Sequence, residues 1–198
     1  MFVIKAFDFD GTLISRDSFP LFAFHALTPF RLMCGVLRSV PVIARWKLGL
    51  INASEAKERI FSRLFKGVSS EKMGKKAELF VPLLDGILSR ETRDHLDDDD
   101  SCRVIVSASP GFWIRPWAAA HGFIDVLATE AEVVDGRFTG RFSTPNCKGE
   151  EKVVRFLEKY PDRKSYILHA WGDSKDDLPL LGLADISHPV GQLRKNMK

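Results

Sequence analysis

The chain contains little cysteine, and its cysteines lack the spacing of a functional site. Cys34, Cys102 and Cys147 are odd in number and far apart, with no CxxC pair and no zinc-ligand spacing. We therefore expect reduced thiols rather than a disulfide framework, as in a cytoplasmic protein. No positively charged segment precedes an apolar stretch near the first residue, so we expect no signal peptide.

The sequence also lacks a large net charge and a long apolar run. A formal net charge of +3 over 198 residues is too small to indicate a nucleic-acid partner. The longest uncharged stretch of the most apolar region, Ser18–Phe30, is too short to cross a bilayer as a helix. What is present, 15 Phe and 4 Trp, can fill the core of one domain or of one domain with an insertion.

The charges are unevenly distributed along the chain. Residues 14–85 contain 12 of the 29 Lys and Arg residues and 6 of the 26 Asp and Glu residues, a charge of +6. The remainder contains 17 basic and 20 acidic residues, a charge of −3. A basic segment beside an acidic one suits a protein that attracts anions and holds a metal ion.

Strands and helices alternate on both sides of a helical segment. Apolar runs predict strands over Phe2–Phe7, Cys102–Val106, Val126–Ala128, Ser165–Ala170 and Ala184–Ser187, with a hairpin over 131–142. Helices are expected over 86–96, 110–121, 150–159 and 178–181, and within the segment over 19–27, 30–40, 42–50, 54–65 and 70–80. Pro41 is expected to break the segment's second helix from its third. The alternation predicts the α/β class, with a doubly wound, Rossmann-like parallel sheet. The acidic run Asp97–Asp100 is expected to be a solvated turn.

Polar groups follow three of the predicted strands. Asp8-Phe9-Asp10-Gly11-Thr12 follows the first strand, Ser107-Ala108-Ser109 the second, and Gly172-Asp173 the strand that begins at Ser165. Ligands of doubly wound sheets bind beyond the carboxyl ends of the strands, so we expect these groups to meet. Two acids two positions apart repel each other unless a cation lies between them, and Mg²⁺ prefers such oxygen ligands. The pattern indicates phosphoryl transfer onto a carboxylate.

Together with the lysines of Asn146–Lys152 and the acids of Gly172–Asp177, these motifs resemble those of a haloacid dehalogenase (HAD) superfamily phosphatase. The resemblance is closest to the phosphoserine phosphatase-like branch and covers nearly the whole chain. It implies a catalytic core over 1–13 and 86–198, with an inserted all-helical cap over 14–85. It also implies a Mg²⁺-dependent phosphomonoester hydrolase that acts on a small phosphorylated metabolite.

The resemblance assigns a role to each motif residue. Asp8 is the expected nucleophile, which forms an aspartyl-phosphate, and Asp10 the general acid and base. Asp8, the Asp10 carbonyl and Asp173 are expected to hold Mg²⁺, with Asp176 and Asp177 orienting its waters or the lysine. The groups expected around the phosphate are Gly11, Thr12, Ser107 and Ala108.

Two lysines compete for the position opposite the metal ion. Phosphoserine phosphatases carry this lysine in an Asn-Ala-Lys-Gly-Glu pattern, which points to Lys148. Other members of the branch carry Cys-x-Gly-Glu-x-Lys, which points to Lys152. We favour Lys152, with Lys148 as the alternative.

The substrate is less defined than the chemistry. Asp17 occupies the place of the acid with which phosphoserine phosphatases bind the substrate amine. The cap phenylalanine and arginine of those enzymes are matched by Ala53 and Ile60, and Arg59 is one residue away. This departure argues against serine specificity, because an unpaired substrate carboxylate loses discrimination.

Three other functions compete with a soluble phosphatase. The apolar, Arg-containing cap favours a lipid-phosphate phosphatase of the phosphatidylglycerophosphate type, in peripheral contact with an anionic membrane. A phosphotransferase or mutase would use the same motifs with another acceptor. A non-catalytic HAD-like binding module is the third, and the intact acids argue against it.

Overall fold

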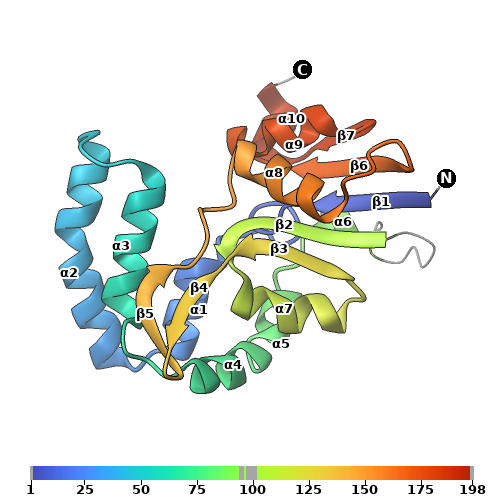
Figure 1. Ribbon diagram of the computed structural model, residues 1–198. Coiled ribbons are helices and arrows are strands. Elements are labelled where there is room, and N and C mark those ends of the chain that lie inside the picture. Colours follow the sequence, from blue (N-terminus) through green and yellow to red (C-terminus); the bar gives the residue numbers. More distant parts are fainter. Residues whose placement is uncertain (1, 94–95, 97–101, 197–198) are drawn as a thin grey trace.

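A parallel five-stranded sheet forms the centre of the molecule (Figure 1). The computed structural model describes residues 2–93, 96 and 102–196. The strand order is β3-β2-β1-β6-β7, and every neighbouring pair is parallel. The strands are β1 (Phe2–Phe7), β2 (Cys102–Pro110), β3 (Asp125–Thr129), β6 (Tyr166–Gly172) and β7 (Ile186–Pro189).

Helices cover both faces of this sheet, because successive strand residues point to opposite sides. Ile4 and Ala6 pack in one apolar cluster with α8 (Glu150–Lys159), α9 (Leu178–Leu183) and α10 (Gly191–Asn196). Phe7 packs on the opposite face with α7 (Gly111–Ala120) and α5 (Val81–Asp85). The predicted doubly wound α/β fold is confirmed.

The helical segment between β1 and β2 extends from the left of Figure 1, beyond the strand ends, to the bottom of the view, below the sheet. Its first four helices are α1 (Ser18–Ala26), α2 (Pro29–Lys47), α3 (Ala53–Phe65) and α4 (Ser70–Glu78). The hairpin β4 (Ala131–Val134) and β5 (Arg137–Phe142) packs against α3. The Phe142 backbone N–H donates to Glu58 Oε1 at 2.9 Å, and the Gly67 N–H donates to the Phe138 carbonyl at 2.7 Å.

A cluster of aromatic side chains, the bridging cluster, joins this segment to the sheet. It consists of Phe22, Phe65, Phe112, Trp113 and Phe138, from α1, α3, α7 and β5. The rings of Phe22 and Trp113 stack with centroids 4.9 Å apart, and those of Phe112 and Phe138 lie 4.8 Å apart. Segment, hairpin and sheet therefore share one apolar core.

Pro41 does not break a helix, contrary to the prediction, because α2 runs through it. A proline inside a helix removes the hydrogen bond to the carbonyl four residues earlier, here that of Leu37. Pro41 and Leu37 both lie on the exposed side of α2, where water can bond this carbonyl. The predicted helices 30–40 and 42–50 are therefore one helix.

Other boundaries differ from the predictions by a few residues. The helix predicted over 86–96 is replaced by α6 (Arg90–Arg93), preceded by α5. β2 continues past Ser107 to Pro110, with an irregularity in its register to β3, and β7 begins two residues later than predicted. The 3₁₀ turn η1 (Lys175–Asp177) precedes α9. Asp97–Asp100 lies outside the described residues.

Candidate active site

The predicted motif residues meet at the carboxyl ends of β1, β2 and β6. They line a cavity of about 350 Å³ together with residues of α3 and α8. The lining includes Asp8, Asp10, Gly11, Asp17, Ser107, Ala108, Lys148, Lys152, Asp173, Asp176 and Asp177. Thr12 lies beside this cavity, buried, with its hydroxyl 3.4 Å from Asp173 Oδ1.

Asp8 lies at the centre of a buried ion-pair network. Its backbone N–H donates to the Trp171 carbonyl of the neighbouring strand at 3.0 Å, which fixes the residue at the strand end. The Lys152 Nζ lies 2.6 Å from Asp8 Oδ1 and 2.5 Å from Asp177 Oδ1. Lys152 reaches both from the first turn of α8 and is buried.

Burial and the neighbouring charges shift the pKa values of Asp8 and Lys152 in opposite directions. Burial raises the pKa of Asp8 to about 8, against the lowering effect of the Lys152 charge. Burial alone would lower the pKa of Lys152, but Asp8 and Asp177 together raise it above its usual range. Lys152 is therefore a permanent cation beside the carboxylate predicted to be the nucleophile.

Three carboxylates could together hold a divalent cation. Oxygens of Asp8, Asp173 and Asp177 lie within 4.8 Å of one another. When all three carboxyls are ionised, Lys152 balances only one of their charges, which leaves an excess of negative charge in a largely buried place. Oxygen ligands and a net negative charge fit Mg²⁺.

Close packing around Gly11 keeps Asp173 in this cluster. Gly11 has a φ of +84°, and a Cβ at this residue would lie 2.4 Å from Asp173 Oδ2. Asp177 Oδ2 accepts hydrogen bonds from the Ser174 backbone N–H at 2.9 Å and from its hydroxyl at 2.7 Å. The carboxylates are therefore positioned by backbone as well as by Lys152.

Asp10 lies apart from the carboxylate cluster, in hydrogen-bonding contact with two serines. Its Oδ1 accepts from the Ser18 backbone N–H at 2.7 Å, and its Oδ2 accepts from the Ser109 hydroxyl. Burial, and secondly the negative charge of Asp17, raise the pKa of Asp10. Its environment favours a carboxyl that keeps a proton more readily than a free aspartate does.

Ser109 and Ser18 were not identified from the sequence. The Trp113 indole N–H donates to the Ser18 hydroxyl at 3.0 Å, so the support of Asp10 extends into the bridging cluster. The Ser109 N–H donates to the Ser107 hydroxyl oxygen at 3.1 Å, which joins the second motif to the first. Ser109 ends the motif Ser107-Ala108-Ser109, so its position two residues after Ser107 could have indicated that it belongs to the site.

Three predicted residues lie at the edge of the cavity instead of in the buried network. Lys148 Nζ lies 3.3 Å from Asp176 Oδ2, and this pair is partly exposed. Asp17 is exposed and accepts from the Phe19 N–H at 2.9 Å as the N-cap of α1. The structure thus brings Lys152, and not Lys148, into contact with Asp8.

Lys57 of α3 is a cavity residue that sequence reasoning missed. Its Nζ donates to the Ala108 carbonyl at 3.0 Å and lies 5.9 Å from the centroid of the Phe19 ring. Burial lowers the pKa of Lys57, and the charges of Asp10 and Asp17 oppose that effect. Arg59, the residue considered for substrate binding, instead pairs with Glu55 at 2.6 Å. One lysine in a charged helix carries no pattern that would separate it from a solvated surface residue.

The family model of haloacid dehalogenase-like hydrolases matches residues 6–182. The chain belongs to this family. The match includes every motif described above and confirms the resemblance drawn from them.

Several known proteins are similar to the chain over most of its length. Protein CicA of Caulobacter vibrioides is 30% identical over 189 residues, which cover 92% of this chain and 83% of CicA. A Bordetella pertussis protein of unknown function has a TM-score of 0.79 at 24% identity, covering 99% of this chain and 94% of that one. A phospho-aspartyl intermediate analogue of phosphoserine phosphatase has a TM-score of 0.60 at 21% identity, covering 98% and 96%. These likenesses to solved structures show the shared fold.

Proposed function

We propose that the protein is a Mg²⁺-dependent phosphomonoester hydrolase that acts through an aspartyl-phosphate on Asp8. The observation that carries the proposal is the contact of Asp8 with Lys152 beside Asp173, at the end of a cavity. The likeness to a phosphoserine phosphatase solved as a phospho-aspartyl intermediate analogue supports the same chemistry.

Asp8, the Asp10 carbonyl and Asp173 would hold Mg²⁺, with Asp177 beside them. When bound, the ion neutralises the attacking carboxylate and a phosphate oxygen. Lys152 supplies a second, fixed positive charge at Asp8 Oδ1, and the Ser107 hydroxyl lines the cavity, where a phosphate oxygen can accept from it. The buried Thr12 hydroxyl instead lies 3.4 Å from Asp173 Oδ1 and would help to hold that carboxylate.

The two acids divide the reaction between them. In the first step, Asp8 attacks phosphorus, the ester P–O bond breaks, and Asp10 gives its proton to the leaving alcohol. In the second step, Asp10 takes a proton from water, the water oxygen attacks phosphorus, and inorganic phosphate leaves Asp8. The raised pKa of Asp10 suits the first step, in which the residue must start protonated.

The cavity favours a small, water-soluble phosphate ester with a second charged group. Its volume is about 350 Å³, and Arg16, Asp17 and Lys57 contribute charges from the segment that covers it. The partly buried ammonium of Lys57 lines the cavity together with Asp10 and can bind a substrate anion a few atoms from the phosphate. This charged lining favours a metabolite over a lipid phosphate.

The first test is the hydrolysis of p-nitrophenyl phosphate with Mg²⁺ by the wild type and by Asp8→Asn. We expect turnover in the wild type and a loss of more than about 1000-fold in the variant, since the nucleophile is gone. Circular dichroism should report an intact fold, because the substitution removes a buried charge and keeps the side-chain shape.

Near-normal turnover by folded Asp8→Asn would refute the nucleophile. Transfer of phosphate to an added sugar phosphate, without release of inorganic phosphate, would favour a mutase. No activity of the wild type with a broad phosphomonoester panel would favour a binding module.

A second test separates the role of Asp10 from that of Asp8. For Asp10→Asn we expect kcat/KM to fall by about 100-fold or more with an alkyl phosphate, whose leaving alkoxide needs a proton. The loss in kcat/KM with p-nitrophenyl phosphate should be clearly smaller, because nitrophenolate leaves without protonation. Equal losses with both substrates would contradict the general-acid role.

A further inference from the structure

The exposed side of α2 is apolar, although most helices at a protein surface present charged residues to water. Gly35, Ser39 and Val42 form the buried side of this helix, against α3. The opposite side carries five apolar side chains that are 51% to 73% exposed: Phe30, Met33, Val36, Leu37 and Val40. These five side chains, here called the α2 face, form an exposed apolar stripe along the helix, which marks an interaction surface.

A row of arginines borders the α2 face. Arg31, Arg38 and Arg45 follow at intervals of seven residues, which places them on one flank of the continuous helix. With Lys47 they are the charged residues of α2, which has no acidic residue. An apolar stripe beside a basic flank is the pattern of a helix that lies in the plane of a membrane interface.

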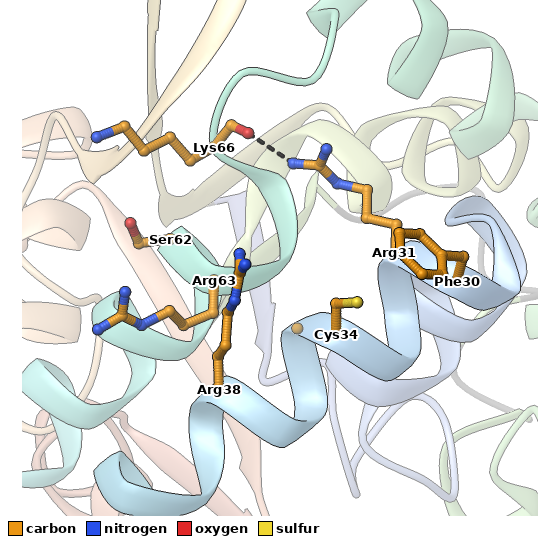
Figure 2. A pocket seen from close by; sticks show the side chains of 8 residues that line it. Phe30, Arg31, Cys34, Arg38, Ser62, Arg63 and Lys66 are labelled. Atoms are coloured by element: carbon orange, nitrogen blue, oxygen red, sulfur yellow. Dashed lines mark hydrogen bonds between the residues drawn. The ribbon is translucent and has the colours of Figure 1, made fainter.

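A basic pocket lies beneath this flank, between α2 and α3 (Figure 2). Its volume is about 510 Å³, and its lining includes Arg38, Arg63 and Lys66 but no acidic residue. Arg31 is held at its end, where it donates to the carbonyls of Leu64 at 2.7 Å and Lys66 at 2.6 Å. In Figure 2 the Arg38 side chain rises from α2 toward Arg63 on α3. Within the described residues Arg38, Arg63 and Lys66 pair with no carboxylate, so the pocket retains its positive charge.

We propose that the α2 face docks on an anionic phospholipid bilayer and that the basic pocket binds a lipid headgroup phosphate. The apolar side chains would enter the interface, and the arginine flank would lie at the level of the phosphates. A second copy of the chain fits the surface less well. The segment 29–68 contains 8 basic and 2 acidic residues, and two such segments would repel each other across a symmetric contact.

This docking is independent of the proposed reaction. Lys57 lies on the side of α3 that faces the active-site cavity, whereas Arg63 lies on the side that faces α2. The α2 face and the active site are therefore separated by a helix, and a docked molecule can still hydrolyse a soluble ester. Within the described ranges, no helix has the length and apolar content to cross a bilayer.

The test is co-sedimentation with phosphatidylcholine vesicles, with and without phosphatidylglycerol. We expect binding only to the anionic vesicles. Leu37→Glu/Val40→Glu should weaken it by at least about tenfold through lost apolar burial. Arg38→Glu/Arg63→Glu should weaken it by roughly 30-fold through reversed charge.

Matched controls are Leu79→Glu, another exposed apolar residue on the basic insertion, and Lys164→Glu, an exposed lysine far along the chain from α2. Both should bind vesicles as the wild type does, and circular dichroism should be unchanged for all four variants.

Three results would overturn the proposal. The first is that the wild type does not sediment with anionic vesicles, or that the α2 variants bind as well as the controls. The second is a concentration-dependent dimer in light scattering that Leu37→Glu/Val40→Glu abolishes. The third is that inorganic phosphate alone binds at the pocket, while the protein does not bind the vesicles. The activity toward soluble substrates is expected to stay at wild-type level in the α2 variants.

Discussion

Lys152 and Lys148 are four residues apart, but Lys152 is buried and Lys148 is partly exposed. We therefore expect their replacement to change the free energy of unfolding by different amounts. Lys152→Met would leave Asp8 and Asp177 buried without their cation. Removing one partner of a buried ion pair costs about 3–5 kcal/mol. Lys148→Met removes a partly exposed pair with Asp176 and should cost less than about 1 kcal/mol. Urea unfolding in a chelator measures both losses, and equal values would contradict the assignment of Lys152 to the buried network.

At the residue scale, the sequence predicted the groups that lie at strand ends. Asp8, Ser107 and Asp173 could be found because each follows an apolar run, and parallel strands bring their carboxyl ends together. Lys57 could not be found in this way. It lies in the middle of a charged helix, and its place in the cavity depends on how α3 packs over the sheet.

At the scale of one element, Pro41 makes α2 less stable than its length suggests. Pro41→Ala should raise the free energy of unfolding by roughly 1–3 kcal/mol, because alanine restores the N–H that can donate to the Leu37 carbonyl. The control is Pro29→Ala at the first position of the same helix, where proline is favourable and no gain is expected. Urea unfolding distinguishes the two, and similar effects would mean that Pro41 does not strain the helix.

The number and order of the strands followed from periodicity, whereas the continuity of the helices and the packing between elements did not. Strands β1 and β2 and helix α8 could be placed from apolar runs, since each lies within one or a few residues of its prediction. The continuity of α2 and the packing of the β4–β5 hairpin on α3 depend on contacts far apart in the sequence. Local propensity carries no information about them.

At the scale of the whole molecule, the proposed metal site at the carboxylate cluster would couple the stability of the protein to metal binding. A ligand that binds the native state at 100 times its Kd stabilises it by about 2.7 kcal/mol. Saturating Mg²⁺ should therefore raise the Tm by roughly 5–10 °C for a chain of this size. Asp173→Asn should abolish this rise in differential scanning calorimetry.

Asp176→Asn is the control for this measurement, because its carboxylate pairs with Lys148 outside the cluster. It should retain the Mg²⁺-dependent rise in Tm. A wild type whose Tm does not respond to Mg²⁺, or an equal loss in both variants, would contradict a metal site at Asp8, Asp173 and Asp177.

The bridging cluster limits which parts of this chain could be exchanged with the corresponding parts of related proteins. Excision of the segment that carries Phe22 and Phe65 would expose Trp113, which is fully buried, and would uncover Phe138 of the hairpin. Each such aromatic contributes several kcal/mol when it leaves water. The inserted segment therefore cannot be exchanged between family members as a module by itself. The unit of exchange is the segment together with the β4–β5 hairpin and the aromatic side of α7.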